Sequence, residues 1–284
     1  MLNLAVLSGN KFGHECSALI GKFRDVRLTG VSAGHNELTG IMLQSQAEKI
    51  MGSSQAVYFD QFPHRFDLFR TAIRNRNHLF CNSLPDFSQD ELKQLLKLSH
   101  EAGSIVQILA PVLFYKNNLK LMESLQTPFL ADFKLALTQE PHLEQRLTEL
   151  LMLLVLADKS ELRKIDLMAI PANETYKMIE IRLAFVSGSV ARFLFSQHLK
   201  EIEQLVTIIP DNAPPFRIHL PPAGTEAFRT SEEQAFGHFL KSLPGKNMPG
   251  IGLPQLLQIG QIRQAIRSRL NVQGRLPDQR KYVV

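Results

Sequence analysis

The spacing of hydrophobic residues along this chain changes near residue 112. Before that point, short apolar runs alternate with segments of helical spacing, which is typical of a parallel sheet wrapped by helices. The apolar runs predict strands at Leu2–Leu7, Val26–Ser32, Ala56–Phe62, His78–Cys81 and Ser104–Val112. The intervening segments predict helices near 13–23, 41–51, 66–76 and 88–102.

The last of these helices has the clearest ends. Ser88 and Glu91 have the spacing of a capping box, in which each side chain bonds the other residue's backbone N–H. Leu92, Leu95 and Leu96 supply its apolar face, and Gly103 can take the left-handed conformation that ends a helix.

After Tyr115 the pattern changes to long alternating strands. They are expected at Phe129–Leu137, Ile165–Ile170, Met178–Val186 and Val190–Phe195, with a short piece at Phe216–Leu220. Helices are expected near 116–125, at His142–Ala157, after Ser231 and over 256–270. Because alternation buries one face, it predicts an open, mostly antiparallel sheet. The α/β chain thus divides into a Rossmann-type parallel-sheet domain at 1–112 and an α+β domain at 113–284 with closing C-terminal helices.

Composition narrows the class of protein. With 284 residues and 44% hydrophobic content, the chain can bury a large core, and no apolar run reaches the roughly 18 residues of a membrane span. The first strand has no basic leader. Cys16 falls at a helix start and Cys81 in a buried strand, so we expect reduced thiols and a cytoplasmic location.

The net charge of +5 is concentrated in the last helix and tail. A solvated face and terminus explain it better than nucleic-acid binding does.

The segment Asn75–Pro111 runs through a loop, a strand, a capped helix and a second apolar strand, and Asn82-Ser83-Leu84 follows the first of these strands. In this order, and in its two closing helices, the chain resembles the glucose-fructose oxidoreductase / inositol dehydrogenase (Gfo/Idh/MocA) family over essentially its whole length. The resemblance implies an NAD(P) cofactor and oxidation or reduction of a sugar or polyol.

The family's phosphate-binding turn is altered here. Its Gly-x-Gly-x-x-Gly positions correspond to Ser8, Asn10 and Gly13, and only the third glycine remains. Gly9 offers a shifted glycine, so the turn can bind a dinucleotide, with Phe12 beside it, or serve as a plain connection.

The end of the second strand carries Ser32 where an acidic residue would bind the ribose hydroxyls. Because Lys11 and His35 are near in sequence, NADP is favoured over NAD, and the absence of any cofactor stays open.

The family's catalytic groups are also missing. Ser83 occupies the position of the active-site lysine, beside Asn82 in place of the family's glutamate, and neither residue can titrate near neutral pH. The helix His142–Ala157, which corresponds to the family helix with an Asp and a His one turn apart, has no histidine after His142. No histidine spacing indicates a metal site.

Two hypotheses follow. The leading one is a degenerate family member, a pseudoenzyme that keeps the scaffold and binds a small-molecule ligand or a partner, as a homodimer through the C-terminal sheet. The alternative is an active NAD(P)-dependent oxidoreductase with rewired catalysis, in which Asp60, His64 or Tyr115 handles the proton.

Overall fold

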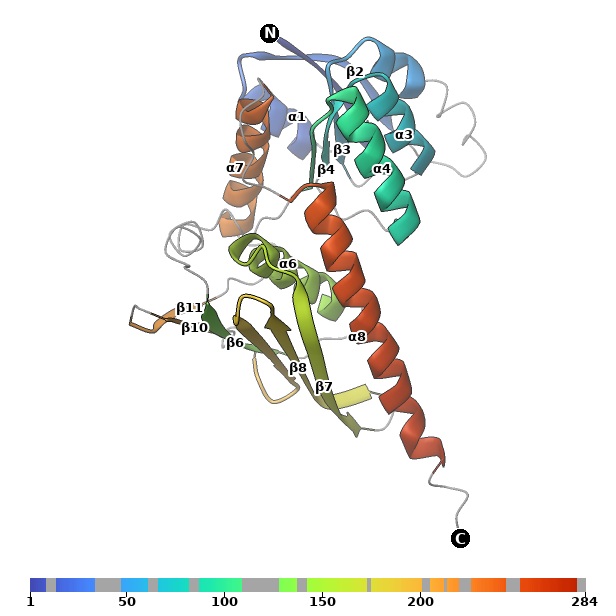
Figure 1. The fold of residues 1–284 in the computed structure, drawn as a ribbon. Helices are drawn as coiled ribbons and strands as arrows, with labels where there is room; N and C mark the ends of the chain where they lie inside the picture. The colour runs from blue at the N-terminus through green and yellow to red at the C-terminus, as the bar shows by residue number, and fades with distance from the viewer. Residues whose placement is uncertain are drawn as a thin grey trace. The chain divides into compact units, whose positions relative to one another are not determined.

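A computed structural model gives the three-dimensional arrangement (Figure 1). It describes residues 1–8, 14–33, 47–60, 66–81, 87–108, 128–136, 142–172, 175–200, 205–211, 214–219, 226–243 and 251–279. The chain forms two compact units: Met1–Pro111 with Thr230–Leu257, and Val112–Arg229 with Gln258–Val284.

The first unit is built on a five-stranded sheet in the order β2-β1-β3-β4-β5, with every neighbouring pair parallel. Its strands are β1 (Leu2–Ser8), β2 (Val26–Ala33), β3 (Ala56–Asp60), β4 (His78–Cys81) and β5 (Val106–Ile108). Both the parallel pairing and these five strands were predicted from the apolar runs. The side chains of β3 from Ala56 to Phe59 are almost entirely buried, which explains why the run is continuous rather than alternating.

Helices cover both faces of this sheet. They include α1 (His14–Gly21), α3 (Phe66–Arg74), α4 (Gln89–Ala102) and α7 (Glu226–Ser242). Phe59 stacks on Phe69 of α3 with ring centroids 4.5 Å apart. The neighbouring Tyr58 packs edge-on against Phe236 of α7 at 5.2 Å. Because successive strand residues point to opposite faces, these two contacts place α3 and α7 on opposite sides of the sheet.

The packing of α7 places part of the C-terminal region in the first unit. Phe236 also contacts Phe80 of β4 at 5.3 Å, and Phe239 contacts Phe80 at 5.2 Å. Phe236 and Phe239 are fully buried. The sequence-based division at residue 112 places α7 with the second domain, whereas contact clustering assigns Thr230–Leu257 to the first unit, and Phe236 and Phe239 pack this helix against the parallel sheet.

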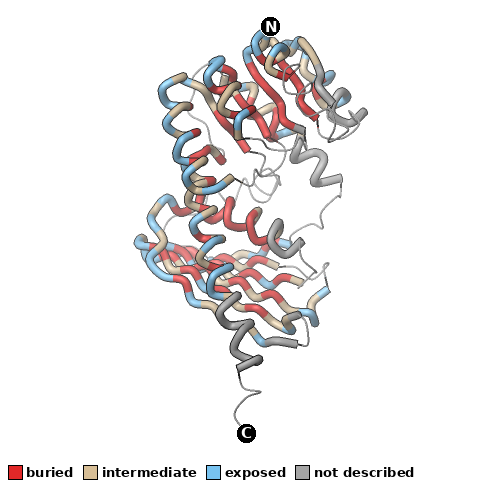
Figure 2. The backbone as a smooth tube through the Cα atoms, turned by 90° about the vertical axis from the view of Figure 1, so that its right-hand side faces the viewer, coloured by how far each residue is buried: buried red, intermediate tan, exposed pale blue. Residues whose placement is uncertain are grey.

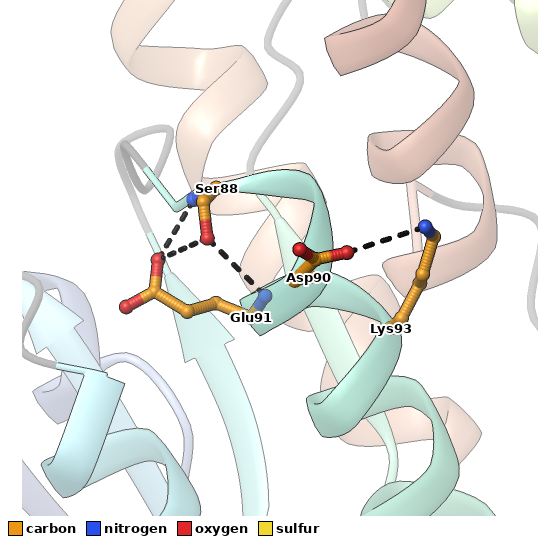
Figure 3. A network of polar contacts seen from close by, with 4 residues as sticks. All are labelled: Ser88, Asp90, Glu91 and Lys93. Carbon is orange, nitrogen blue, oxygen red and sulfur yellow. Dashed lines mark hydrogen bonds and ion pairs between the residues drawn. The ribbon is translucent and has the colours of Figure 1, made fainter.

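The capping box predicted at α4 is present (Figure 3). The Ser88 hydroxyl accepts a hydrogen bond from the Glu91 N–H at 3.3 Å, and the Ser88 N–H donates to the Glu91 carboxylate at 2.8 Å. Gly103 follows the helix with φ of 66°, the left-handed conformation expected of it.

The second unit contains a six-stranded mixed sheet in the order β11-β10-β6-β9-β8-β7. Its strands are β6 (Phe129–Ala136), β7 (Leu162–Ala172), β8 (Thr175–Phe185), β9 (Val190–Ser196), β10 (Leu205–Pro210) and β11 (Phe216–His219). Only the β6–β9 pair is parallel. Strand β10 was not predicted from the sequence: its burial alternates, but the outward-facing Leu205 and Ile209 are apolar, so apolar and polar residues do not alternate along it.

One face of this sheet is core, and α6 (His142–Ala157) lies along it (Figures 1 and 2). Phe133 of β6 stacks on Phe193 of β9 with centroids 4.6 Å apart. Helix α6 contributes an unbroken buried run from Leu150 to Val155. The last helix, α8 (Leu253–Gln279), buries Ile259, Ile262 and Ile266 at helical spacing.

Candidate functional site

The carboxyl ends of the parallel strands meet at one edge of the first sheet. Ser8 is in register with Ala33 of β2 on one side and with Asp60 of β3 on the other. Because the chain runs from β1 to β2 in one direction and to β3 in the other, this is the point where the strand order reverses. Open parallel sheets bind their ligands outside such a point.

The structure brings three of the predicted site residues to this edge. Ser8 ends β1 and is completely buried, Asp60 ends β3 beside it, and Ser32 of β2 is in register with Leu7. The other predicted positions lie outside the described residues: Gly9, Asn10, Phe12, Gly13, His64, Asn82, Ser83 and Tyr115. The topology therefore gathers the ends of the strands, and the roles predicted for the loop residues stay predictions.

Cys81 ends β4 at the same edge but is not available for nucleophilic chemistry. Its side chain is fully buried, and burial raises the pKa of the thiol far above its ordinary value. A thiol held neutral in this way does not attack a substrate, because the thiolate is the nucleophile. Cys81 is a buried packing group of the strand, as the sequence predicted.

His78 lies at the opposite, amino end of β4. Its Nδ1 accepts a hydrogen bond from the Ile105 N–H at 3.1 Å, which fixes the neutral imidazole. Burial lowers the pKa of His78. This histidine therefore orders the entry into β5 and takes no part in chemistry at the carboxyl edge.

The resemblance to the dehydrogenase family implies that two catalytic groups, an Asp and a His one turn apart, would lie on α6. From Arg146 onward its described side chains include two charged groups, Arg146 and Glu149, which form an ion pair at 3.0 Å. Thr148 is buried, and the following residues are leucine, methionine and valine. No Asp and His one turn apart occur in this described part of the helix.

The described ranges contain neither a metal-ligand cluster nor a membrane-spanning helix. No group of three or more His, Cys, Asp or Glu side chains there has the geometry to hold a metal ion. No helix among those same residues combines the length and hydropathy needed to cross a bilayer.

No protein-family model and no curated protein sequence matches this chain significantly. Solved structures match the fold. A dehydrogenase from Chromobacterium violaceum superposes with a TM-score of 0.73 at 12% identity, over 100% of this chain and 99% of that one. The UDP-N-acetylglucosamine 3-dehydrogenase from Acidithiobacillus ferrooxidans has a TM-score of 0.70 at 12% identity, over 94% and 98%. GenD2 from gentamicin A biosynthesis, solved in complex with NAD, has a TM-score of 0.67 at 11% identity, over 92% and 91%.

These similarities define the class of fold. The chain has the Gfo/Idh/MocA dehydrogenase fold, a Rossmann-like parallel sheet followed by a mixed, mostly antiparallel sheet. The resemblance read from the strand order and the capped helix is thereby confirmed at the level of the fold. Because one fold hosts many activities, the reaction has to be argued from the residues of this chain.

Proposed function

We propose that this chain is a non-catalytic protein of the dehydrogenase fold that uses the scaffold to bind a small-molecule ligand or a partner. The observation that carries the proposal is the sequence after β4. The strand ends at Cys81, so Ser83 follows it at the strand-end position where the family carries its lysine.

The chemistry of alcohol oxidation explains why this residue matters. Hydride transfer to a nicotinamide ring requires that the substrate hydroxyl also lose a proton, and a positioned base usually accepts it. A serine hydroxyl donates and accepts hydrogen bonds but does not titrate near neutral pH. Support also comes from the described part of α6, which presents leucines and the Arg146–Glu149 pair instead of a proton-transferring histidine.

A nicotinamide cofactor remains compatible with this fold, since GenD2 was solved with NAD. In this chain the turn from Ser8 to Gly13 would hold the pyrophosphate. The end of β2 has Ser32 and Ala33 and offers no carboxylate for the ribose hydroxyls. For this reason we propose NADP rather than NAD as the preferred ligand if a nicotinamide binds.

One observation favours the alternative, an active NAD(P)-dependent oxidoreductase. Asp60 ends β3 directly beside Ser8, at the point where the strand order reverses. A carboxylate at such a point is suitably placed to accept a proton, with His64 or Tyr115 as the other candidates from the sequence.

Cofactor titration and a turnover assay separate these two functions. Protein is titrated with NADPH and NADH by fluorescence and thermal shift, and then incubated with each oxidised cofactor and a panel of sugar nucleotides, polyols and aldoses. We expect no nicotinamide reduction by the wild type. Turnover that is lost in Asp60→Asn and kept in the exposed control Asp90→Asn would establish the enzyme instead. A dissociation constant in the low micromolar range, about −8 kcal/mol, without turnover would make the cofactor the bound ligand.

We also propose a homodimer that associates through the C-terminal sheet, in a protein of the cytoplasm. The support is the face of that sheet opposite the buried phenylalanines, which carries exposed apolar side chains. We call it the outer face and define it by alternate residues of the strands: Leu130–Ala136 of β6, Asp166–Ile170 of β7, Met178–Ala184 of β8, Val190–Ser196 of β9 and Leu205–Ile209 of β10.

A further inference from the structure

The edges of the six-stranded sheet are poorly suited to strand addition. At one edge, β7 has register irregularities near both ends and carries Pro171, which cannot donate a hydrogen bond. At the other edge, β11 is only four residues long. Bulges, proline and short edge strands are the devices by which sheets avoid pairing with other chains. Association of this sheet with another molecule is therefore expected on its outer face.

The outer face concentrates the exposed apolar side chains. Of the seven large hydrophobic side chains that are exposed among the described residues, four lie on it: Leu130 (40%), Ile209 (41%), Ile170 (44%) and Met168 (49%). Leu130 and Ile209 are direct cross-strand neighbours. Met168 and Ile170 lie on β7, separated from that pair by β9 and β8, so the face carries two apolar pairs, and exposed apolar area of this kind marks a docking surface.

Charged residues run through the middle of this apolar face. Arg192 of β9 binds Glu180 through its Nε at 2.8 Å and lies 3.8 Å from Asp132. The pairing with Glu180 raises the pKa of Arg192. These three residues therefore form an ion-paired cluster that carries one surplus negative charge.

Arg182 of β8 also points to the outer face, but it is not part of this cluster of ion pairs. It is exposed, and it lies directly opposite Arg192 in the β8–β9 register, where two like charges repel. Its other cross-strand neighbour, Asp166, is paired with Lys164 at 3.0 Å. Within the part of the chain that the structure describes, no carboxylate is ion-paired with Arg182. A carboxylate supplied from outside would relieve this repulsion.

We propose that a second copy of this chain supplies the carboxylate, and that Arg182 pairs with the partner's Glu180. Two sheets packed face to face keep their strands roughly aligned. A two-fold axis that lies between them, perpendicular to the strands and midway between residues 180 and 182, brings each Arg182 over the partner's Glu180. The same axis brings Asp132 over the partner's Lys134, because residues 132 and 134 occupy the same two rows through the β6–β9–β8 register.

The charges select this axis over one that runs along the central strand. An axis along β9 would place Arg192 against its own copy, which is unfavourable when water is excluded. The pairing of Arg182 with the partner's Glu180 instead joins the surplus positive charge of one copy to the surplus negative charge of the other. This inference rests on the proposed dimer and adds its axis and its ion pairs.

A charge exchange tests the pairing. Dimer dissociation constants are measured by sedimentation equilibrium for the wild type, Arg182→Glu, Glu180→Arg and the double exchange. We expect each single reversal to raise the dissociation constant at least about tenfold, because like charges then face each other twice in the dimer. The double exchange should return it to within about threefold of the wild type. Lys97→Glu, an exposed change of equal charge on α4, should leave it unchanged.

The possible results test the existence of the dimer and the position of its two-fold axis separately. A monomeric wild type overturns the dimer and the axis and leaves the absence of catalysis untouched. A wild-type dimer that is unaffected by Arg182→Glu, or one that the double exchange fails to rescue, overturns the axis alone. If these variants do not fold, as judged by circular dichroism, Asp132→Lys with Lys134→Asp provides an independent exchange. Failure of that double variant to recover from its single reversals rejects the axis as well.

Discussion

The two sheets of this protein differ in how many of their faces are covered. The parallel sheet is buried on both sides, so Tyr58 and Phe59, adjacent in β3, both lie in core. In the mixed sheet, Phe193 is buried, while its neighbours Arg192 and Leu194 point to the outer face. A doubly covered sheet can bind ligands only at its strand ends, whereas a singly covered sheet offers a whole surface. We therefore expect ligand binding in the first unit and self-association in the second.

The largest expected effect concerns the doubly covered sheet. Phe80→Ala removes the ring that Tyr58, Phe236 and Phe239 contact, and should lower the free energy of unfolding by about 3–5 kcal/mol. Phe59→Ala, on the other face, should cost a similar amount. Urea unfolding of monomeric, diluted protein measures both.

Leu130→Ala on the outer face provides the contrast. Its side chain is exposed in the single chain, so the same measurement should differ from the wild type by no more than about 0.5 kcal/mol. A loss comparable with that of Phe80→Ala would mean that the outer face is covered within one chain, and the contrast between the sheets would not hold.

A smaller effect is expected at Asp158, where the second unit buries a carboxylate. Asp158 accepts a hydrogen bond from the Ser160 N–H at 2.9 Å and another from the Ser187 hydroxyl, and Ser189 lies 3.0 Å from Ser187. Burial alone would raise the pKa of Asp158, but these hydrogen bonds outweigh it and the pKa is lowered. Asp158→Asn should cost about 1–3 kcal/mol at neutral pH.

The lowered pKa also predicts how the stability contributed by Asp158 changes with pH. Because the folded pKa lies below the unfolded value of about 4, the stabilisation is complete above that pH and is lost as the pH falls through the folded pKa. The difference between wild type and Asp158→Asn in urea unfolding should therefore shrink below about pH 4. A difference that stays constant from pH 7 to pH 3 would assign the effect to packing rather than to the charge.

Much of this fold could be predicted because its signals are local. Continuous apolar runs indicated parallel strands, and Ser88 with Glu91 indicated the start of α4, since each depends on neighbours in sequence. The parallel β6–β9 pairing within an otherwise antiparallel sheet was not predictable in this way. It joins strands about sixty residues apart, and register at that separation is set by packing.

The sequence indicated where the candidate site lies better than it indicated which interactions its residues make. The sequence placed Ser8 and Ser32 at strand ends, and the parallel order β2-β1-β3 found in the structure brings them to one edge with Asp60. The ion pairs of the outer face could not be foreseen. Arg192 meets Glu180 and Asp132 only through the register of three strands, and β10 beside them had not been recognised.

The smallest expected effect is at the N-terminal cap of α4, a helix of the first unit. Ser88→Ala removes the hydroxyl that accepts from the Glu91 N–H and should lower the free energy of unfolding by about 1 kcal/mol (Figure 3). Lys93→Ala is the matched control, since its ion pair with Asp90 at 3.3 Å is exposed and should contribute less than about 0.5 kcal/mol. Thermal and urea unfolding measure both variants. If Ser88→Ala costs no more than Lys93→Ala, the packing of Leu92 and Leu95 alone sets where this helix begins, and the cap adds nothing to the stability of the covered sheet.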